Sequence, residues 1–211
     1  MDMLRITAHL AGPLVMNGRT TFDALLAAVV FDQTGSLESA HADLPLKQTD
    51  GLWYASSAMI EPHAVNMSVI VQGMRPDDQW LDHNLIKKNK HGRVYSTFES
   101  FASTGVSNLF NPTITYHADA VDWYATGDAD RIRALLERLP MIGKKRATRV
   151  VRWDVEEGEL DGVIGYADDP LRPVPVDRWN GDRSGPIVDA AWRPAYWDVN
   201  NRVPCYVPAL N

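Results

Sequence analysis

The fold is decided by residues 122–155, DWYATGDADRIRALLERLPMIGKKRATRVVRWDV, which predict a strand, a helix, a basic loop and a second strand in succession. Gly127 ends the first strand, and the carboxylate of Asp128 can accept hydrogen bonds from the free amides of the first helical turn. Pro140 is expected to end the helix. Its apolar residues recur at helical spacing: Ile132, Leu135, Leu136 and Leu139. One apolar stripe is therefore expected to pack against a sheet.

The loop after this helix concentrates positive charge. Gly143 opens the loop, and five cations occupy the nine positions that follow it: Lys144, Lys145, Arg146, Arg149 and Arg152. The whole chain has 21 basic and 27 acidic residues and a formal net charge of −6, so this concentration runs against the average. A polyanion is the expected partner, and the simplest alternative is a solvated turn. A nucleotide-binding P-loop is excluded, because Arg138 stands where that motif needs glycine and Lys145 where it needs serine or threonine.

Apolar patterns elsewhere predict an α+β domain. Residues 3–10 alternate as a half-buried strand whose polar face is available for a ligand, and a helix is expected from about Thr21. Residues 52–60 and 63–72 are expected to form the middle hairpin. This order predicts a ferredoxin-like (RRM-like) β-α-β-β-α-β fold over residues 1–160, with both helices on one face of the sheet.

A basic insertion is expected at about residues 74–113, where the periodicity fades. Its cations are Lys87, Lys88, Lys90 and Arg93, and aromatic residues lie on both sides of them. A basic loop with aromatic residues suits single-stranded RNA, because rings stack on bases while cations hold phosphates. The alternative is a solvated hairpin tip whose aromatic residues belong to the core. These four cations are the second choice of RNA-binding residues.

The C-terminal segment has an unusual composition. The last 42 residues hold seven of the 13 prolines together with several large aromatic residues. Prolines exclude long helices and central strands, while aromatic residues argue against disorder. We predict a proline-rich extended arm over residues 161–211, packed on the domain or docked on a partner.

Several classes of protein are excluded by composition. Cys205 is the only cysteine, so neither an internal disulfide nor a Cys-x-x-Cys metal site is expected, and no other metal or cofactor site is indicated. The start of the chain has neither a signal peptide nor a membrane span, which predicts a cytoplasmic protein without membrane contact. The acidic net charge argues against indiscriminate nucleic-acid binding, so any such site must be local.

The strand-helix unit that ends in Ile-Gly-Lys-Lys-Arg (residues 142–146) resembles the C-terminal half of the RAMP superfamily, the ferredoxin-like RNA-binding subunits of CRISPR effector complexes. The likeness is closest to the crRNA 5′-handle-binding subunit (the Cas "five" class) of type IV systems. Residues 3–31, 53–57 and 172–176 add to the resemblance. The family's loop usually continues with glycines, where this chain has Arg149 and Val151, so phosphate contacts through side chains are expected instead of backbone contacts.

The resemblance implies a non-catalytic RNA-binding subunit that caps the 5′ handle of a crRNA. Its partners would be the crRNA, the backbone and large or small subunits of the effector complex, and target DNA through the complex. Some relatives are metal-independent endoribonucleases, for which His9 and His91 are the first candidates to act as acid or base. A third alternative is a structural protein of a phage or mobile element whose basic loops are incidental.

Overall fold

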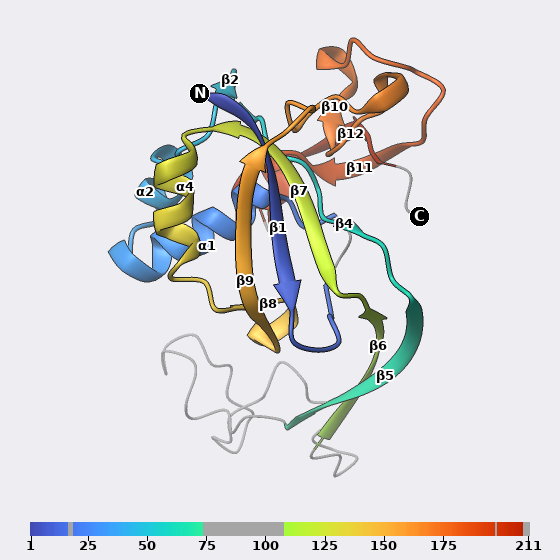
Figure 1. The fold of residues 1–211 in the computed structure, drawn as a ribbon. Helices are drawn as coiled ribbons and strands as arrows, with labels where there is room; N and C mark the ends of the chain where they lie inside the picture. The colour runs from blue at the N-terminus through green and yellow to red at the C-terminus, as the bar shows by residue number, and fades with distance from the viewer. Residues whose placement is uncertain (17–18, 74–107, 197, 209–211) are drawn as a thin grey trace, which may run out of the picture. The chain divides into compact units, whose positions relative to one another are not determined.

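The computed structural model describes residues 1–16, 19–73, 108–196 and 198–208 (Figure 1). The chain divides into two compact units, one of Met1–Val65 with Thr115–Asn211 and one of Asn66–Ile114. The first unit contains an antiparallel main sheet, covering helices and a smaller C-terminal sheet. The predicted α+β class is confirmed.

The main sheet has the strand order β4-β7-β1-β9-β8, and each neighbouring pair is antiparallel. Its strands are β1 (Asp2–Leu10), β4 (Met59–Ile60), β7 (Ala120–Gly127), β8 (Met141–Ile142) and β9 (Thr148–Glu157). Ile6 of β1 lies opposite both Trp123 of β7 and Val155 of β9. The alternating strand predicted at residues 3–10 is therefore the centre of the sheet.

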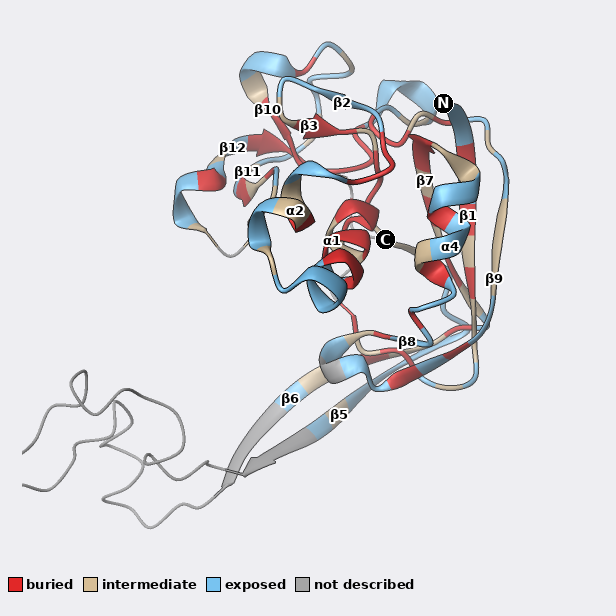
Figure 2. Ribbon diagram, turned by 90° about the vertical axis from the view of Figure 1, so that its left-hand side faces the viewer, coloured by how far each residue is buried: buried red, intermediate tan, exposed pale blue. Residues whose placement is uncertain are grey.

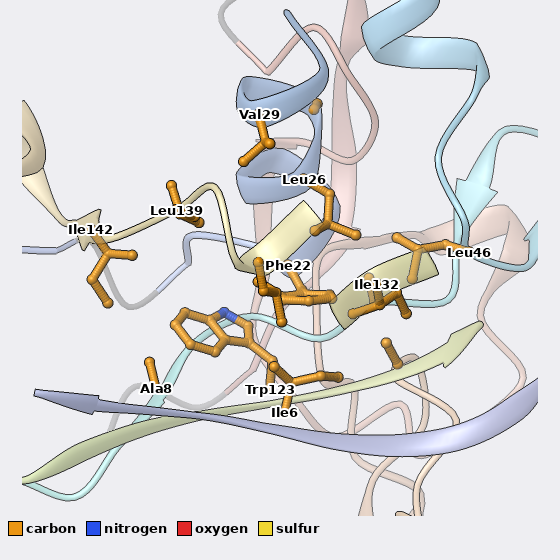
Figure 3. Packing of buried hydrophobic residues seen from close by; sticks show 14 of the residues in the cluster. Ile6, Ala8, Phe22, Leu26, Val29, Leu46, Trp123, Ile132, Leu139 and Ile142 are labelled. Atoms are coloured by element: carbon orange, nitrogen blue, oxygen red, sulfur yellow. The ribbon is translucent and has the colours of Figure 1, made fainter. Parts of the chain in front are cut away.

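Two helices cover one face of this sheet (Figures 1 and 2). They are α1 (Phe22–Thr34), which is followed by the short α2 (Leu37–Ala42), and α4 (Ala129–Leu136). Figure 3 shows Phe22 of α1 and Ile132 of α4 packed over Ile6 and Trp123 of the strands, and all four side chains have no exposed surface. Each buried apolar side chain of this size contributes about 1.5–3 kcal/mol. The apolar stripes predicted on both helices are confirmed.

The ends of α4 follow partly from the sequence. The Asp128 carboxylate accepts hydrogen bonds from the amides of Asp130 and Arg131, both at 3.1 Å, as predicted for the helix start. The helix ends at Leu136, before the predicted stop at Pro140. The reason is that the chain tightens into 3₁₀-like turns, in which the amide of Leu139 bonds to the carbonyl of Leu136.

The middle of the fold differs from the predicted hairpin. β5 (Ala64–Gly73) pairs with β6 (Asn108–His117) instead of with residues 52–60, and β4 pairs with β7. The alternation at residues 63–72 identified a strand correctly. A pattern of period two shows which residues share a face but does not name the partner strand.

A short hairpin precedes these strands. β2 (Gln48–Thr49) and β3 (Leu52–Trp53) are joined by Asp50 and Gly51, whose φ angles are 50° and 86°. A type I′ turn needs positive φ at both positions, and Asp-Gly is a preferred pair for it. A Cβ on Gly51 would lie 3.4 Å from the Trp192 ring, so the hairpin tip packs directly against the C-terminal part of the chain.

The C-terminal segment forms a small sheet with the strand order β10-β12-β11. Its strands are β10 (Val174–Pro175), β11 (Ile187–Ala191) and β12 (Arg202–Tyr206), and its 3₁₀ turns are η3 (Tyr166–Asp168), η4 (Val176–Arg178) and η5 (Val199–Asn201). This differs from the extended arm predicted for residues 161–211. Pro204 lies in the central strand β12, but β10 pairs only as far as Cys205, so Pro204 has a neighbouring strand on one side. A strand proline is tolerated at such a position.

The aromatic residues of this segment pack within the chain. Trp179, Trp192 and Tyr206 are 2 %, 6 % and 5 % exposed and form a second core cluster with Val174 and Leu52. Leu52 belongs to β3, so this cluster joins the hairpin to the C-terminal sheet. Burial of the aromatic side chains explains why a proline-rich segment is nevertheless ordered.

Candidate nucleic-acid interface

The basic loop begins at a close approach between two parts of the chain. Gly143 has φ +82°, and a Cβ there would lie 2.8 Å from the carbonyl oxygen of Val15. The amide of Lys144 donates a hydrogen bond of 2.6 Å to the same carbonyl, and the turn η2 (Lys144–Arg146) follows. Gly143 thus packs against the loop that follows β1. Contacts with a ligand are therefore left to the side chains of the basic residues.

Lys144 and Arg149 are exposed cations of this site. Arg149 lies near the start of β9, opposite Met141 of the edge strand β8, so the basic segment continues from the turn into the sheet. Among the described residues neither cation has a carboxylate oxygen within 4.0 Å. The side chain of Lys145 is not among those that the structure describes. Lys144 and Arg149 are therefore positioned to receive an anionic ligand.

Arg146 is already paired. Its guanidinium donates a hydrogen bond to the carboxylate of Asp32 on α1, and the two side chains are 54 % and 49 % exposed. An ion pair so exposed contributes at most about 1 kcal/mol. A phosphate could replace Asp32 at little cost, because the existing interaction is weak. Asp32 is 114 residues away in the chain, and no sequence pattern pointed to it.

Arg152 belongs to a different cluster, on the face of the sheet opposite the helices. His9 Nε2 lies 2.7 Å from Asp154 Oδ2 and 3.1 Å from Arg152 Nη2, and Arg152 lies 3.0 Å from the same Asp154 oxygen. The hydrogen bond with His9, together with the charge of Arg152, lowers the pKa of Asp154. The carboxylate therefore stays ionised at neutral pH and holds His9 in a fixed orientation.

The rest of this polar face is balanced in charge. Arg5 bonds to Asp122 at 2.7 Å, and the Thr7 hydroxyl donates to the same carboxylate. Glu156 lies opposite Arg5 in the register. The face predicted to be available for a ligand thus pairs its cations with carboxylates. Lys144 in the turn η2 and Arg149 at the start of β9 instead have no carboxylate partner in the part of the chain that the structure describes.

Comparison with known protein families gives a match that covers nearly the whole chain, and therefore all of the elements described above. The family described as CRISPR type IV associated protein Csf3 matches residues 2–208. The chain belongs to this family. The predicted resemblance to a type IV CRISPR subunit is confirmed at that level. No curated protein matches the chain.

Other predicted residues of this Csf3-family chain lie outside the described residues. They are the second-choice cations Lys87, Lys88, Lys90 and Arg93, and the candidate acid or base His91. The described part also contains exposed cations that the sequence did not single out: Lys47, Arg178 and Arg193. Lys47 is more than 100 residues away from the other two, so no local charge run marked the group.

Across the described ranges, no group of three or more His, Cys, Asp and Glu side chains is placed to bind a metal ion. None of the described helices combines the length and the apolar character that crossing a bilayer requires.

Proposed function

We propose that this chain is the non-catalytic RNA-binding subunit of a type IV CRISPR effector complex and caps the 5′ handle of the crRNA. The observation that carries the proposal is the exposure of Lys144 and Arg149 without a carboxylate partner among the described residues, in a chain of net charge −6. Cations that neutralise phosphates release counterions, which supplies much of the affinity for nucleic acids. Lys145 and Arg146 complete the proposed set of phosphate contacts at the turn. Arg152, which is paired with Asp154 in the His9 cluster, is proposed as a weaker additional contact.

The topology supports a place in the RAMP superfamily. Strand order β9-β1-β7-β4 is antiparallel throughout, α1 follows β1, and α4 connects β7 to β9. A ferredoxin-like β-α-β-β-α-β domain requires this order and these two helices on one face. We therefore propose that the main sheet is a ferredoxin-like domain in which the basic turn η2 leads into the last strand.

Membership of a CRISPR type IV family supports the proposed partners. We propose crRNA as the direct ligand, the backbone and large or small subunits as protein neighbours, and target DNA as a ligand of the whole complex. Purifying the tagged full chain from cells that also express its complex and a CRISPR array tests this. Sequencing should recover short RNAs with one common 5′ end. RNA of random 5′ sequence, or none, would contradict the proposal.

A metal-independent endoribonuclease is the second candidate function. The observation that favours it is the His9 cluster, in which the Asp154 carboxylate orients the imidazole and Arg152 lies beside it. General acid–base catalysis of phosphodiester cleavage can use these groups. The pairing of Arg152 with Asp154 argues against an endoribonuclease, because it leaves less positive charge for a transition-state phosphate.

We predict that the purified chain leaves repeat RNA intact, with or without divalent metal. The test is denaturing gel analysis of end-labelled RNA after prolonged incubation with the wild type, with His9→Ala and with His41→Ala as a matched histidine control. Cleavage that is lost in His9→Ala and kept in His41→Ala would replace the non-catalytic function by the endoribonuclease.

A further inference from the structure

Three cations from distant parts of the chain converge on the β2–β3 hairpin. Lys47 Nζ lies 4.1 Å from the centroid of the Tyr54 ring. The guanidinium carbons of Arg178 and Arg193 lie 4.7 Å and 5.1 Å from the centroid of the Trp192 ring. All three cations are exposed, so their charges face the solvent. We call Lys47, Arg178 and Arg193 the hairpin cations.

The two arginines are held in fixed positions. Arg178 Nη1 donates a hydrogen bond of 2.5 Å to the carbonyl of Asp50 in the hairpin turn, and Arg193 Nε donates one of 2.8 Å to Asn201 Oδ1. The carbonyl of Trp192 accepts a hydrogen bond from Arg172, which is fully buried. Guanidinium groups fixed in this way lose little side-chain entropy when they bind a ligand.

The hairpin cations also lack acidic partners. Within the described ranges none of them has a carboxylate oxygen within 4.0 Å, whereas Arg5, Arg146 and Arg152 each do. An unpaired cation needs no existing ion pair to be broken before an anion binds. Three such cations around one hairpin, in a chain with six more acidic than basic residues, indicate an anionic partner.

The chemistry of the surface favours phosphates over a protein. The Trp192 ring is only 6 % exposed and carries both arginines, so it is available neither as an apolar anchor for a partner protein nor as a platform for a base. Planar guanidinium groups match phosphate oxygens with two donors at once. We infer that the hairpin cations form a second phosphate-binding surface, which holds a nucleic-acid backbone independently of its sequence.

The test replaces all three hairpin cations with glutamine in the full chain: Lys47→Gln, Arg178→Gln and Arg193→Gln. Binding of a 20-nucleotide single-stranded RNA and of a 20-base-pair DNA duplex is measured at three salt concentrations. Each phosphate that the variant no longer neutralises should reduce the slope of log affinity against log salt by about 0.7 for the single strand or 0.9 for the duplex. We expect the variant to lose at least tenfold in affinity at the lowest salt for at least one probe.

Two further variants keep this test specific. Arg131→Gln, Arg183→Gln and Arg202→Gln together remove the same charge from exposed positions and should leave the slope within half a unit of the wild type. Arg178→Lys with Arg193→Lys keeps the charge and should keep the slope. If the triple variant melts early, Lys47→Gln alone is used, because its side chain makes no hydrogen bond in the described part of the chain.

An unchanged salt slope for both probes in the folded triple variant would overturn the inference. Poly-glutamate is measured as a third probe. If the triple variant loses binding to poly-glutamate but keeps its binding to nucleic acid, the surface belongs to an acidic protein, and the inference is also overturned. This result is independent of the proposed function. Handle binding is tested by replacing Lys144 and Arg149, and the triple variant keeps both residues.

Discussion

Replacing Arg172 with methionine is expected to lower the free energy of unfolding by about 3–5 kcal/mol, because it leaves a buried carboxylate without its counter-charge. Arg172 and Asp23 both have no exposed surface, and Arg172 Nη1 lies 3.3 Å from Asp23 Oδ1. The tryptophan carbonyls at positions 53 and 192 also accept hydrogen bonds from this guanidinium. Methionine fills much of the same volume but donates nothing.

Arg172 connects distant parts of the chain, so its replacement lowers the stability of the whole fold. Its guanidinium joins α1, through Asp23, to the β3 segment and to the C-terminal sheet. Tyr196 completes the network, since its hydroxyl accepts from Arg172 at 2.7 Å and donates to Asp23. Burial raises the pKa of Tyr196, so the phenol keeps the proton that it donates. Loss of Arg172 therefore weakens the packing of the second core against the first.

Urea unfolding followed by tryptophan fluorescence measures this loss. Arg202→Met is the matched control, because Arg202 and Asp189 form an exposed pair whose removal should cost at most about 1 kcal/mol. Cys205 gives an independent signal: it has no exposed surface, and burial raises the pKa of its thiol to about 11, so labelling by a thiol reagent requires opening of the second core. Equal stability of the Arg172→Met and Arg202→Met variants would contradict the assigned role of the network.

Replacing Lys144 and Arg149 with alanine is expected to weaken binding of the handle RNA by on the order of tenfold for each side chain removed. The slope of log affinity against log salt should fall by about 0.7 for each phosphate that is no longer neutralised. The physical reason is that both side chains are exposed and have no carboxylate partner among the described residues, so each can neutralise a phosphate. Fluorescence anisotropy with the labelled RNA at three salt concentrations measures both quantities.

Two controls separate the site from general charge effects. Arg183→Ala with Arg202→Ala removes the same charge from exposed positions of the C-terminal segment and should leave the salt slope unchanged. Asp32→Asn removes the partner of Arg146 and should strengthen binding several-fold at low salt, since a freed guanidinium is added to the site. Equal affinities of the Lys144/Arg149 variant and the wild type at all salt concentrations would remove these residues from the RNA interface.

The sequence was most informative where the deciding interactions are local. The cap at Asp128 and the apolar spacing that begins at Ile132 act within one or two helical turns, so the start and buried face of α4 could be predicted. The same holds for the alternation of β1. The basic turn between Ile142 and Thr148 also lies where these local segments predict it.

Interactions between distant residues could not be predicted in the same way. The pairing of β5 with β6 depends on which strand is available, which the alternation of β5 does not encode. Composition identified the aromatic residues of the C-terminal segment but not the small sheet that buries them. The pairs Arg146 with Asp32 and Arg172 with Asp23 join positions more than 100 residues apart, and nothing in the neighbouring sequence marks either arginine as paired.

Photo-crosslinking shows directly whether the basic turn holds the 5′ handle of the RNA. The full chain is assembled in its complex with a crRNA that carries 4-thiouridine in the handle, irradiated, and analysed by mass spectrometry of the crosslinked peptides. We expect crosslinks in peptides that span residues 139–152, and the Lys144 and Arg149 substitutions should reduce them. Handle crosslinks confined to other parts of this chain, or to other subunits, would contradict this expectation.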